Sequence, residues 1–375
     1  MMVVVVGNHA PEKAEEIRLS VLRAQVEPLF CSDTDRAREL LGRADQPVPR
    51  CVLVDGAAPG LEPFIAWVRG EARLFSVPVV VMVPARDEGA FCEAHALGAD
   101  DVVVAEDRDG VTRRLMGLSE FDPTARPPIT QGRAVVAHDE MGRRRVLGRI
   151  LRQAGFDVSF AASADEATDV ARTGEVPSLV VAKHELSGGG ALTAVRGLRE
   201  AVATRVPFVV LGAARDLRDL GRVADGLGSV AVTSELAPPD NLLFLANELL
   251  RPGVENARAS ARLLHGALCG FRPAGELESE WGLTYNISRE GIYVRTLDAP
   301  APGTEVWLEL RPPRSTRAVQ LTATVVWRRG AKSGASGASP PGFGARILPE
   351  SCAIGSLSAY HEGYERLRAE PRLLH

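Results

Sequence analysis

Short hydrophobic runs alternate with amphipathic helical patterns through the first 250 residues of the chain. Valine-rich runs such as residues 3–6 and 79–83 are apolar throughout. Patterns with apolar positions every three or four residues lie between such runs, as over residues 12–25 and 142–154. Continuous apolar strands that alternate with helices are typical of a parallel sheet covered on both faces. This part of the chain therefore predicts an α/β fold.

The α/β pattern occurs twice. Residues 77–87, VPVVVMVPARD, match residues 206–216, VPFVVLGAARD, and residues 48–55 match residues 176–183. A unit of about 120 residues holds about five βα repeats. Ligands of such sheets bind at the carboxyl ends of the strands. We expect two doubly wound, flavodoxin-like domains, each with a five-stranded parallel sheet.

Periodicity changes to alternation in the last third of the chain. Residues 319–325, VQLTATV, place apolar side chains on one face and polar ones on the other, and residues 291–295 and 306–310 behave similarly. Several such strands without intervening helices predict a small antiparallel β-barrel. A C-terminal helix is predicted over residues 352–367, with an apolar stripe. The stripe comprises Ile354, Leu357, Tyr360, Tyr364 and Leu367.

Proline-containing segments mark the boundaries between these parts. Residues 122–128, DPTARPP, favour an extended spacer, and residues 251–253, RPG, end the last helix of the second α/β copy. The predicted domains are residues 1–121, residues 129–251 and residues 254–370.

Composition excludes several classes of protein. The formal net charge of −4 gives no overall basic surface for nucleic acid, so an anionic ligand must meet a local arginine cluster. Five scattered cysteines without a CxxC pair are typical of reduced thiols in a cytoplasmic protein. The apolar N-terminal run lacks a preceding basic region, and no apolar run is long enough to cross a membrane. We expect a cytoplasmic protein that is not embedded in a membrane.

Two short motifs stand in order before and within the predicted barrel. Arg258 and Arg262 form an RxxxR motif, but arginine is frequent here and the same spacing recurs over residues 145–149 and 218–222. Those two instances lie in helical patterns, where arginines four residues apart share a solvated face. The RxxxR motif therefore indicates a site only in combination with the second motif.

The second motif is Asn286-Ile-Ser288-Arg-Glu-Gly291, of the form (D/N)xSxxG. Its structural alternative is a tight turn, with Asn286 and Ser288 bonded to the backbone and Gly291 at positive φ. Together, the two motifs resemble the pair found in PilZ domains, which are small β-barrels that bind cyclic di-GMP in many bacteria. Residues 340–348, PPGFGARIL, resemble a late barrel strand of the same family.

The resemblance implies a ligand site. Its residues would be Arg258, Arg262, Asn286, Ser288 and Gly291. An arginine fork pairs with phosphate oxygens and its face stacks on a purine. The short polar side chains suit a guanine edge or a phosphate, and the glycine lets the backbone approach closely. The family often has adjacent arginines at the start of the arm, whereas this chain has Ala257 before the first one, which removes one possible phosphate contact.

The two α/β copies resemble receiver domains of two-component response regulators. That family phosphorylates an aspartate at the end of the third strand, beside a metal-binding acidic pair, a Ser/Thr and a lysine. In the first copy Asp55 has the acceptor position, but residues 7–8, GN, replace the acidic pair. Val83 and Ala105 replace the hydroxyl and the lysine. We expect Asp55 to be an inactive phosphoacceptor position with no bound metal.

The second copy departs further from the receiver pattern. Lys183 stands at the acceptor position, His138-Asp139 at the acidic pair and Gly212 at the Ser/Thr position. Lys183 could form a fixed ion pair with Asp139, or its side chain could extend outward into water. We expect the outward orientation.

These observations predict a bacterial signalling effector that is not an enzyme. It would bind cyclic di-GMP at the PilZ domain and relay the signal to protein partners through pseudo-receiver domains, with no nucleic-acid partner. One alternative is a response regulator that is phosphorylated at Asp55 and uses the barrel as a non-binding adaptor. The other is a scaffold with neither activity. A homodimer is left open.

Overall fold

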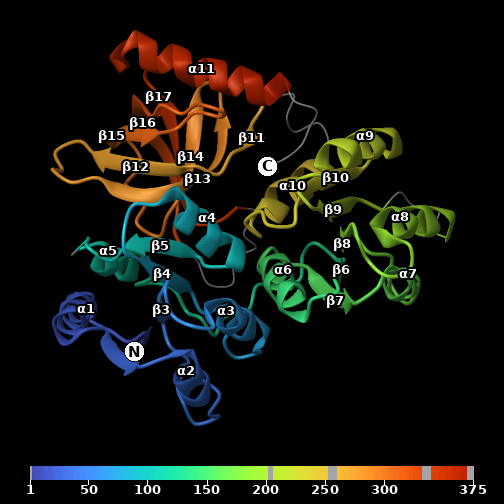
Figure 1. Ribbon diagram of the computed structural model, residues 1–375, viewed down its shortest axis with the longest axis horizontal. Coiled ribbons are helices and arrows are strands. Elements are labelled where there is room, and N and C mark those ends of the chain that lie inside the picture. The colour runs from blue at the N-terminus through green and yellow to red at the C-terminus, as the bar shows by residue number, and fades with distance from the viewer. Residues whose placement is uncertain (1, 108, 202–205, 252–259, 332–338, 370–375) are drawn as a thin grey trace. The chain divides into compact units, whose positions relative to one another are not determined.

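The structure is a computed structural model that describes residues 2–107, 109–201, 206–251, 260–331 and 339–369 (Figure 1). The chain forms two compact units. The first unit contains the chain up to Ala125 together with the barrel strands and the C-terminal helix from His265 onward. The second unit runs from Arg126 to Leu264.

The first α/β domain has five parallel strands in the order β2-β1-β3-β4-β5. The strands are β1 (Met2–Val6), β2 (Glu27–Cys31), β3 (Cys51–Asp55), β4 (Val79–Val83) and β5 (Asp101–Val104). The helices are α1 (Pro11–Arg23), α2 (Thr34–Leu41), α3 (Leu61–Gly70), α4 (Glu88–Leu97) and α5 (Gly110–Gly117). The strand order reverses direction at β1, which makes the sheet doubly wound and places a ligand crevice at the carboxyl ends of β1 and β3.

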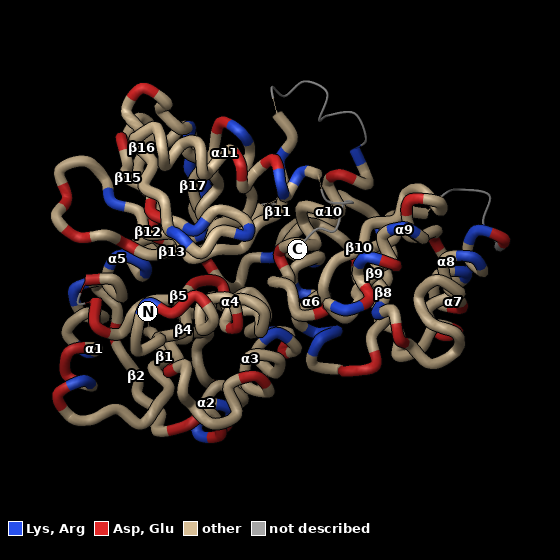
Figure 2. The backbone as a smooth tube through the Cα atoms, turned by 45° about the horizontal axis from the view of Figure 1, so that its top comes forward, with Lys and Arg blue, Asp and Glu red and all other residues tan. Residues whose placement is uncertain are grey.

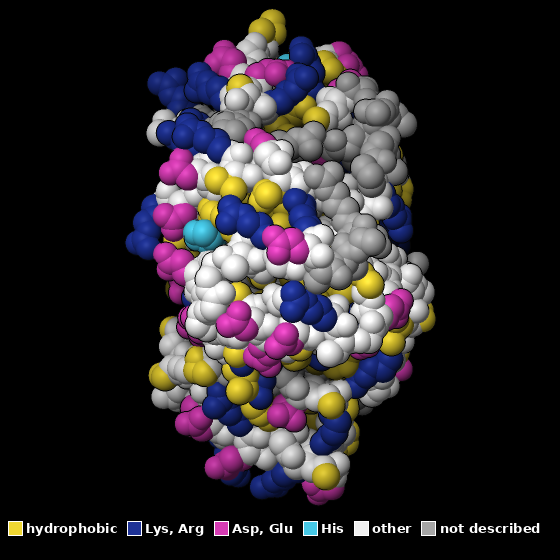
Figure 3. All heavy atoms as spheres, turned by 90° about the vertical axis from the view of Figure 1, so that its right-hand side faces the viewer, with side chains coloured by type: hydrophobic (Ala, Val, Ile, Leu, Met, Phe, Trp, Pro, Cys, Tyr) yellow, Lys and Arg dark blue, Asp and Glu magenta, His cyan; other side chains and the backbone are white. Residues whose placement is uncertain are grey.

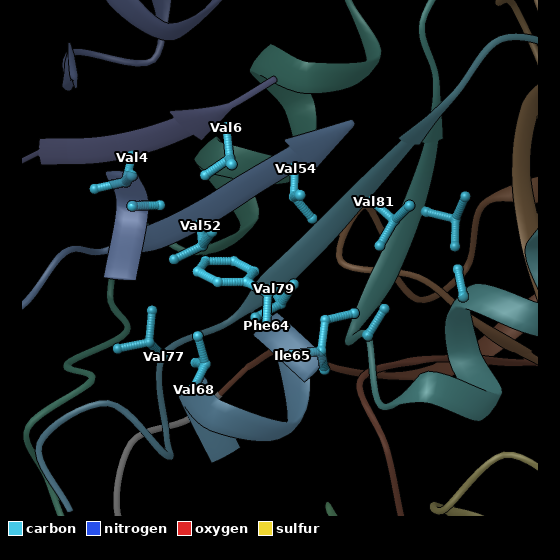
Figure 4. Packing of buried hydrophobic residues seen from close by; sticks show 14 of the residues in the cluster. Val4, Val6, Val52, Val54, Phe64, Ile65, Val68, Val77, Val79 and Val81 are labelled. Atoms are coloured by element: carbon cyan, nitrogen blue, oxygen red, sulfur yellow. The ribbon is translucent and has the colours of Figure 1, made fainter. Parts of the chain in front are cut away.

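Two hydrophobic clusters fill the two faces of this sheet. On one face the α3 side chains Phe64, Ile65 and Val68 point toward the valines of β1, β3 and β4 (Figure 4). On the other face Ile17 of α1 and Leu115 of α5 pack against the remaining strand side chains. Both faces are covered, which explains why the strands are apolar at every position.

The second unit repeats the architecture in the order β7-β6-β8-β9-β10. Its strands are β6 (Arg133–Ala137), β7 (Asp157–Ala161), β8 (Leu179–Lys183), β9 (Phe208–Gly212) and β10 (Val230–Ser234). Its helices are α6 (Met141–Gln153), α7 (Ala164–Arg172), α8 (Gly190–Ala201), α9 (Leu217–Leu227) and α10 (Asn241–Leu250). The predicted pair of five-stranded doubly wound folds is confirmed.

Six antiparallel strands form a closed barrel, as predicted. They are β12 (Leu268–Pro273), β13 (Glu280–Ser288), β14 (Gly291–Arg295), β15 (Glu305–Leu310), β16 (Val319–Arg329) and β17 (Gly342–Ile347). The order is β13-β12-β15-β16-β17-β14, and pairing of β13 with β14 closes the barrel. The 3-10 turn η2 (Pro349–Ser351) leads into the C-terminal helix α11 (Ile354–Ala369), which lies along the barrel (Figure 1).

Fewer residues of α11 are buried against the barrel than the predicted apolar stripe contains. Tyr360 and Tyr364 are buried, but Ile354 is 85% exposed because it begins the helix. Gly363 lies against Pro312 and Pro313, and a Cβ at Gly363 would meet the Cβ of Pro312 at 2.8 Å. The absence of a side chain at residue 363 therefore lets the helix approach the barrel closely.

The barrel and the first α/β domain share their hydrophobic cores. Leu283 of β13 belongs to the cluster on the α3 face, and Trp281 packs against the same cluster. Leu297, which follows β14, belongs to the cluster on the α1–α5 face. Gly117 accommodates this contact, since a Cβ there would lie 2.1 Å from the Leu297 carbonyl oxygen. The first unit is therefore a continuous body rather than two separately packed domains.

Candidate ligand-binding site

The second motif forms the tip of the β13–β14 hairpin. Asn286 pairs with Tyr293, Ser288 pairs with Gly291, and the two residues between them make the turn. The pairing register shifts between Thr284 and Asn286, which marks a β-bulge just before the motif. Bulges re-aim the side chains that follow them and are common beside functional sites.

Gly291 is required here for space rather than for an unusual backbone angle. It is not among the described glycines with positive φ, contrary to the turn that the structural alternative assumed. A Cβ at Gly291 would meet the Ala345 carbonyl oxygen of β17 at 2.8 Å. The Ser288 hydroxyl donates to the Gly291 carbonyl oxygen at 3.3 Å. The motif is thus compatible with the tight packing of a strand against β17.

Helix α11 holds this turn from outside the hairpin. The Tyr360 hydroxyl donates to the Ser288 carbonyl oxygen at 2.7 Å, and the Gly291 carbonyl oxygen lies 3.2 Å away. The His361 ring nitrogen Nε2 lies 3.1 Å from the Arg289 carbonyl oxygen. The turn therefore depends on a segment that follows it by about seventy residues in the sequence.

Aromatic rings lie next to the motif on the neighbouring strands. The rings of Tyr285 and Tyr293 meet edge to face with centroids 5.2 Å apart, and Tyr293 meets Trp327 in the same way at 4.7 Å. A Cβ at Gly344 would lie 2.4 Å from the Trp327 ring, so the ring rests on the bare backbone of β17. Three aromatic side chains therefore pack together directly beside the motif.

The opposite end of the hairpin is fixed to the first α/β domain by buried charges. Glu280, at the start of β13, forms ion pairs with Arg113 and Arg114 of α5. The backbone N–H of Leu297, beyond the end of β14, donates to the Asp101 carboxylate at 2.7 Å. Both strands that carry the motif are therefore anchored where they meet the α/β domain.

Three of the five predicted ligand residues lie together. Asn286, Ser288 and Gly291 are placed at one turn of the first unit. Arg262 lies just before the short strand β11 (Leu263–Leu264). Arg258 lies outside the described residues.

In the first α/β domain, Asp55 ends β3 at the switch point of the sheet. His9 Nδ1 lies 3.8 Å from the Asp55 carboxylate, and the carboxylate accepts the Ala57 backbone N–H at 2.9 Å. A Cβ at Gly7 would collide with the Asp55 Cβ at 2.8 Å and with His9 Nε2 at 2.9 Å. The space for the acidic pair of a receiver is thus taken by the His9 ring.

Lys13, on α1, extends toward the end of β5, at a position where the receiver pattern has no lysine. Lys13 Nζ donates to the Ala105 carbonyl oxygen, immediately after β5. Burial lowers the pKa of His9, Asp55 raises it, and Lys13 lowers it further, with a net decrease. Near Asp55 an imidazole thus stands in place of the carboxylate pair of a receiver, and Lys13 is close enough to His9 to act on its pKa.

The outward orientation expected for Lys183 is wrong. Its side chain is 15% exposed, and Nζ lies 3.0 Å from Asp139 and 3.1 Å from Glu235. Burial opposes the charged ammonium group, but the hydrogen bonds to the two carboxylates outweigh this effect and raise the pKa of Lys183. His138 Nε2 lies 3.2 Å from the same Glu235 carboxylate. The second acceptor region is therefore filled by an internal charge cluster.

Comparison with protein families decides the nature of the barrel. Residues 256–351 match the family described as the PilZ domain. The barrel is a PilZ domain. Two receiver-like domains precede it in the chain, and their assignment rests on the repeated strand order of the two sheets.

Several solved structures are similar to parts of this chain. One is an inhibitor of motility from Bacillus subtilis (MotI/DgrA), with 21% identity and a TM-score of 0.25, covering 30% of this chain and 51% of that chain. The chain thus spans about half the length of that protein. Another is the receiver domain of a histidine kinase from Syntrophus aciditrophicus, with 18% identity and a TM-score of 0.28, covering 32% and 93%.

A third is a probable two-component response regulator/GGDEF domain protein, with 18% identity and a TM-score of 0.32, covering 66% of this chain and 97% of that chain. Comparison with curated proteins found no match.

Charge is dispersed around the PilZ and receiver-like domains. Acidic and basic positions are interspersed along the backbone (Figure 2), and the face shown in Figure 3 carries side chains of both signs. Within the described ranges, no group of three or more His, Cys, Asp and Glu side chains is arranged to hold a metal ion. No helix in the described part of the chain combines the length and the apolar character that a bilayer crossing needs.

Sequence reasoning missed several residues that shape the PilZ domain and the receiver-like sites. Tyr360 was assigned to an apolar stripe, although its hydroxyl bonds to the motif turn. Glu235 and His9 carry no motif of their own, and only the folded sheets bring them to the strand ends. The sequence offered one signal for these two residues, since each follows a predicted parallel strand. The carboxyl ends of such strands meet at one edge of the sheet, so polar residues there come together.

Proposed function

We propose that this protein is a bacterial signalling effector that binds cyclic di-GMP at its PilZ domain and relays the signal through its receiver-like domains. The observation that carries the proposal is the placement of the (D/N)xSxxG motif at a hairpin tip of the PilZ barrel. There Asn286 is only 7% exposed and is preceded by a β-bulge. A nearly buried amide beside a bulge has a fixed orientation, which suits it to recognise one polar edge of a ligand.

Cyclic di-GMP presents two phosphates and two guanines. Arg258 and Arg262 supply planar guanidinium groups, which pair with phosphate oxygens and stack on purines. Asn286 and Ser288 supply short hydrogen-bonding groups for a guanine edge or a phosphate. Gly291 lets the turn pack closely against Ala345 of β17, which holds the two polar side chains in place. The net charge of −4 means that attraction of the ligand depends on these local arginines.

The receiver-like domains act in this proposal as protein-interaction modules in the cytoplasm. Asp55 has His9 in place of a metal-binding pair, and Lys183 is neutralised by Asp139 and Glu235. Neither arrangement supplies the metal ion that offsets the charge of an incoming phosphoryl group. The input to the protein is therefore the nucleotide, and the output is a change in protein contacts without catalysis.

Calorimetric titration of the full chain with cyclic di-GMP tests the proposal, with cyclic di-AMP as the matched control. We expect saturable binding of cyclic di-GMP that weakens as salt rises, because arginine–phosphate contacts are screened by ions. We expect the ligand to raise the melting temperature, since it binds the folded state. The absence of both heat and a melting shift at saturating ligand would overturn the proposal.

A further inference from the structure

The motif turn is bonded to the C-terminal helix at both of its ends. The Tyr360 hydroxyl donates to the Ser288 carbonyl oxygen at 2.7 Å and lies 3.2 Å from the Gly291 carbonyl oxygen. These two residues are the paired positions that open and close the turn. One phenol therefore contacts both backbone positions that flank the turn of the motif.

The remaining turn residues also meet α11. His361 lies 3.1 Å from the Arg289 carbonyl oxygen, and the Arg289 guanidinium lies 3.5 Å from the Glu365 carboxylate. The ion pair is exposed and therefore contributes little to stability. The Tyr360 contact is different, because the side chain is fully buried and a buried hydrogen-bonding group is costly to leave without a partner.

The position of α11 is itself fixed. Gly363 packs against Pro312 and Pro313 so closely that a Cβ would lie 2.8 Å from the Pro312 Cβ. A tyrosine keeps its proton at neutral pH, and burial raises the pKa of Tyr360 further above its usual value, so the phenol remains a donor. The helix is thus a rigid support from which a permanent donor reaches the turn.

We propose that Tyr360 is a positioning residue for cyclic di-GMP, which holds the Ser288–Gly291 turn in the shape that presents Asn286 and Ser288 to the ligand. The inference rests on the proposed function and assigns to the C-terminal helix a role that neither motif contains. Tyr360 itself does not touch the ligand. Its effect on binding is transmitted through the two carbonyl groups of the turn.

The test uses the full chain and two variants, Tyr360→Phe and Tyr364→Phe. Tyr364 is a matched control, because it is a buried tyrosine on the same helix, one turn further along. Removing one buried hydrogen bond at Tyr360 should weaken cyclic di-GMP binding about three- to tenfold. The salt dependence of binding should not change, because the arginines are intact. Amide hydrogen exchange of residues 288–291 should become faster in ligand-free Tyr360→Phe.

The outcomes separate the inference from the proposed function. Wild-type binding with an unchanged affinity and unchanged exchange in Tyr360→Phe would overturn the role of Tyr360 and leave the proposed function standing. Equal effects of Tyr360→Phe and Tyr364→Phe would show general loosening of α11 and would also overturn it. A wild-type chain that does not bind cyclic di-GMP would overturn the proposed function, and the inference with it.

Discussion

The Arg114 guanidinium of α5 lies 3.3 Å from the Glu280 carboxylate at the start of β13, and the two side chains are only 2% and 8% exposed. Arg114 also lies 3.1 Å from the Asp101 carboxylate and donates to the Trp281 carbonyl oxygen at 2.8 Å. A single buried cation thus joins the first receiver-like sheet to the PilZ barrel. Removing it leaves two buried carboxylates without this partner.

Replacement of Arg114 should therefore destabilise the protein strongly. We expect Arg114→Ala to lower the free energy of unfolding by about 3–5 kcal/mol, the cost of breaking a buried ion pair. Arg23→Ala is the control, because Arg23 pairs with Asp109 at 3.3 Å on the surface, and it should cost less than about 1 kcal/mol. Denaturant unfolding measures both changes. Equal losses would contradict the importance of the buried cluster.

The RxxxR motif should matter for binding and not merely for charge. Replacement of Arg258 or Arg262 by alanine should cost about 1.5–3 kcal/mol each, typical of a charged hydrogen bond. This corresponds to about ten- to a hundredfold in affinity for cyclic di-GMP, measured by calorimetry. Arg145→Ala and Arg218→Ala are matched controls from the same spacing on α6 and α9. If the controls weaken binding equally, bulk charge rather than a site is responsible.

Neither receiver-like domain should accept phosphate. Asp55 has the acceptor position, but the His9 ring occupies the place of the acidic pair, and Lys183 replaces the second acceptor. Incubation with acetyl phosphate and Mg²⁺ should leave the intact mass of the full chain unchanged. Beryllofluoride should likewise leave the protein's spectra unchanged. A stoichiometric acid-labile phosphate on Asp55 would instead support a response regulator with the barrel as an adaptor.

Stability should fall as the pH falls below neutrality, in part because of His95. Burial lowers the pKa of His95 well below its usual value, and Arg295 lowers it further, while the Ala99 carbonyl and Asp100 oppose the shift. The pKa of a buried histidine is lower in the folded state than in the unfolded state, where it is about 6.5. Such a histidine contributes fully to the stability of the folded state above about pH 6.5, and this contribution is lost as the pH falls toward the pKa of the folded state. Melting temperatures between pH 7.5 and 5 should decrease less steeply in His95→Gln than in the wild type.

The control for this pH dependence is His265→Gln, because His265 is only partly buried. That variant should keep the slope of the wild type. An unchanged slope in His95→Gln would show that other groups carry the acid sensitivity.

The sequence predicted those parts of the fold that depend on local periodicity. Strand β16 begins at Val319, where the alternation begins, and α10 ends at Leu250, directly before the RPG segment that was predicted to end it. The repeated segments gave two sheets of identical order. Apolar positions that repeat every two residues in a strand, or about every 3.6 residues in a helix, show which face of the element is buried. These strands and helices could therefore be located from the sequence alone.

Long-range polar contacts could not be predicted in the same way. Arg114 follows Arg113 on a short helix and has the pattern of an ordinary surface arginine, although Glu280 makes it part of the core. Lys183 was expected in water because Glu235 was not recognised as a second carboxylate beside Asp139. In each case the outcome depends on a partner far away in the sequence, and neither residue type nor spacing reports that partner.

The hydrophobic clusters shared by the barrel and the first receiver-like domain limit how the gene can be recombined. Genes for signalling proteins can be recombined freely only when each encoded domain keeps its hydrophobic core to itself. Here Leu283 and Leu297 of the PilZ barrel complete two clusters of the first receiver-like domain, although the second domain separates them in the gene. Transfer of the barrel alone to another protein would expose both leucines. The first and third coding segments are therefore expected to travel together through evolution, with the middle one as the exchangeable insert.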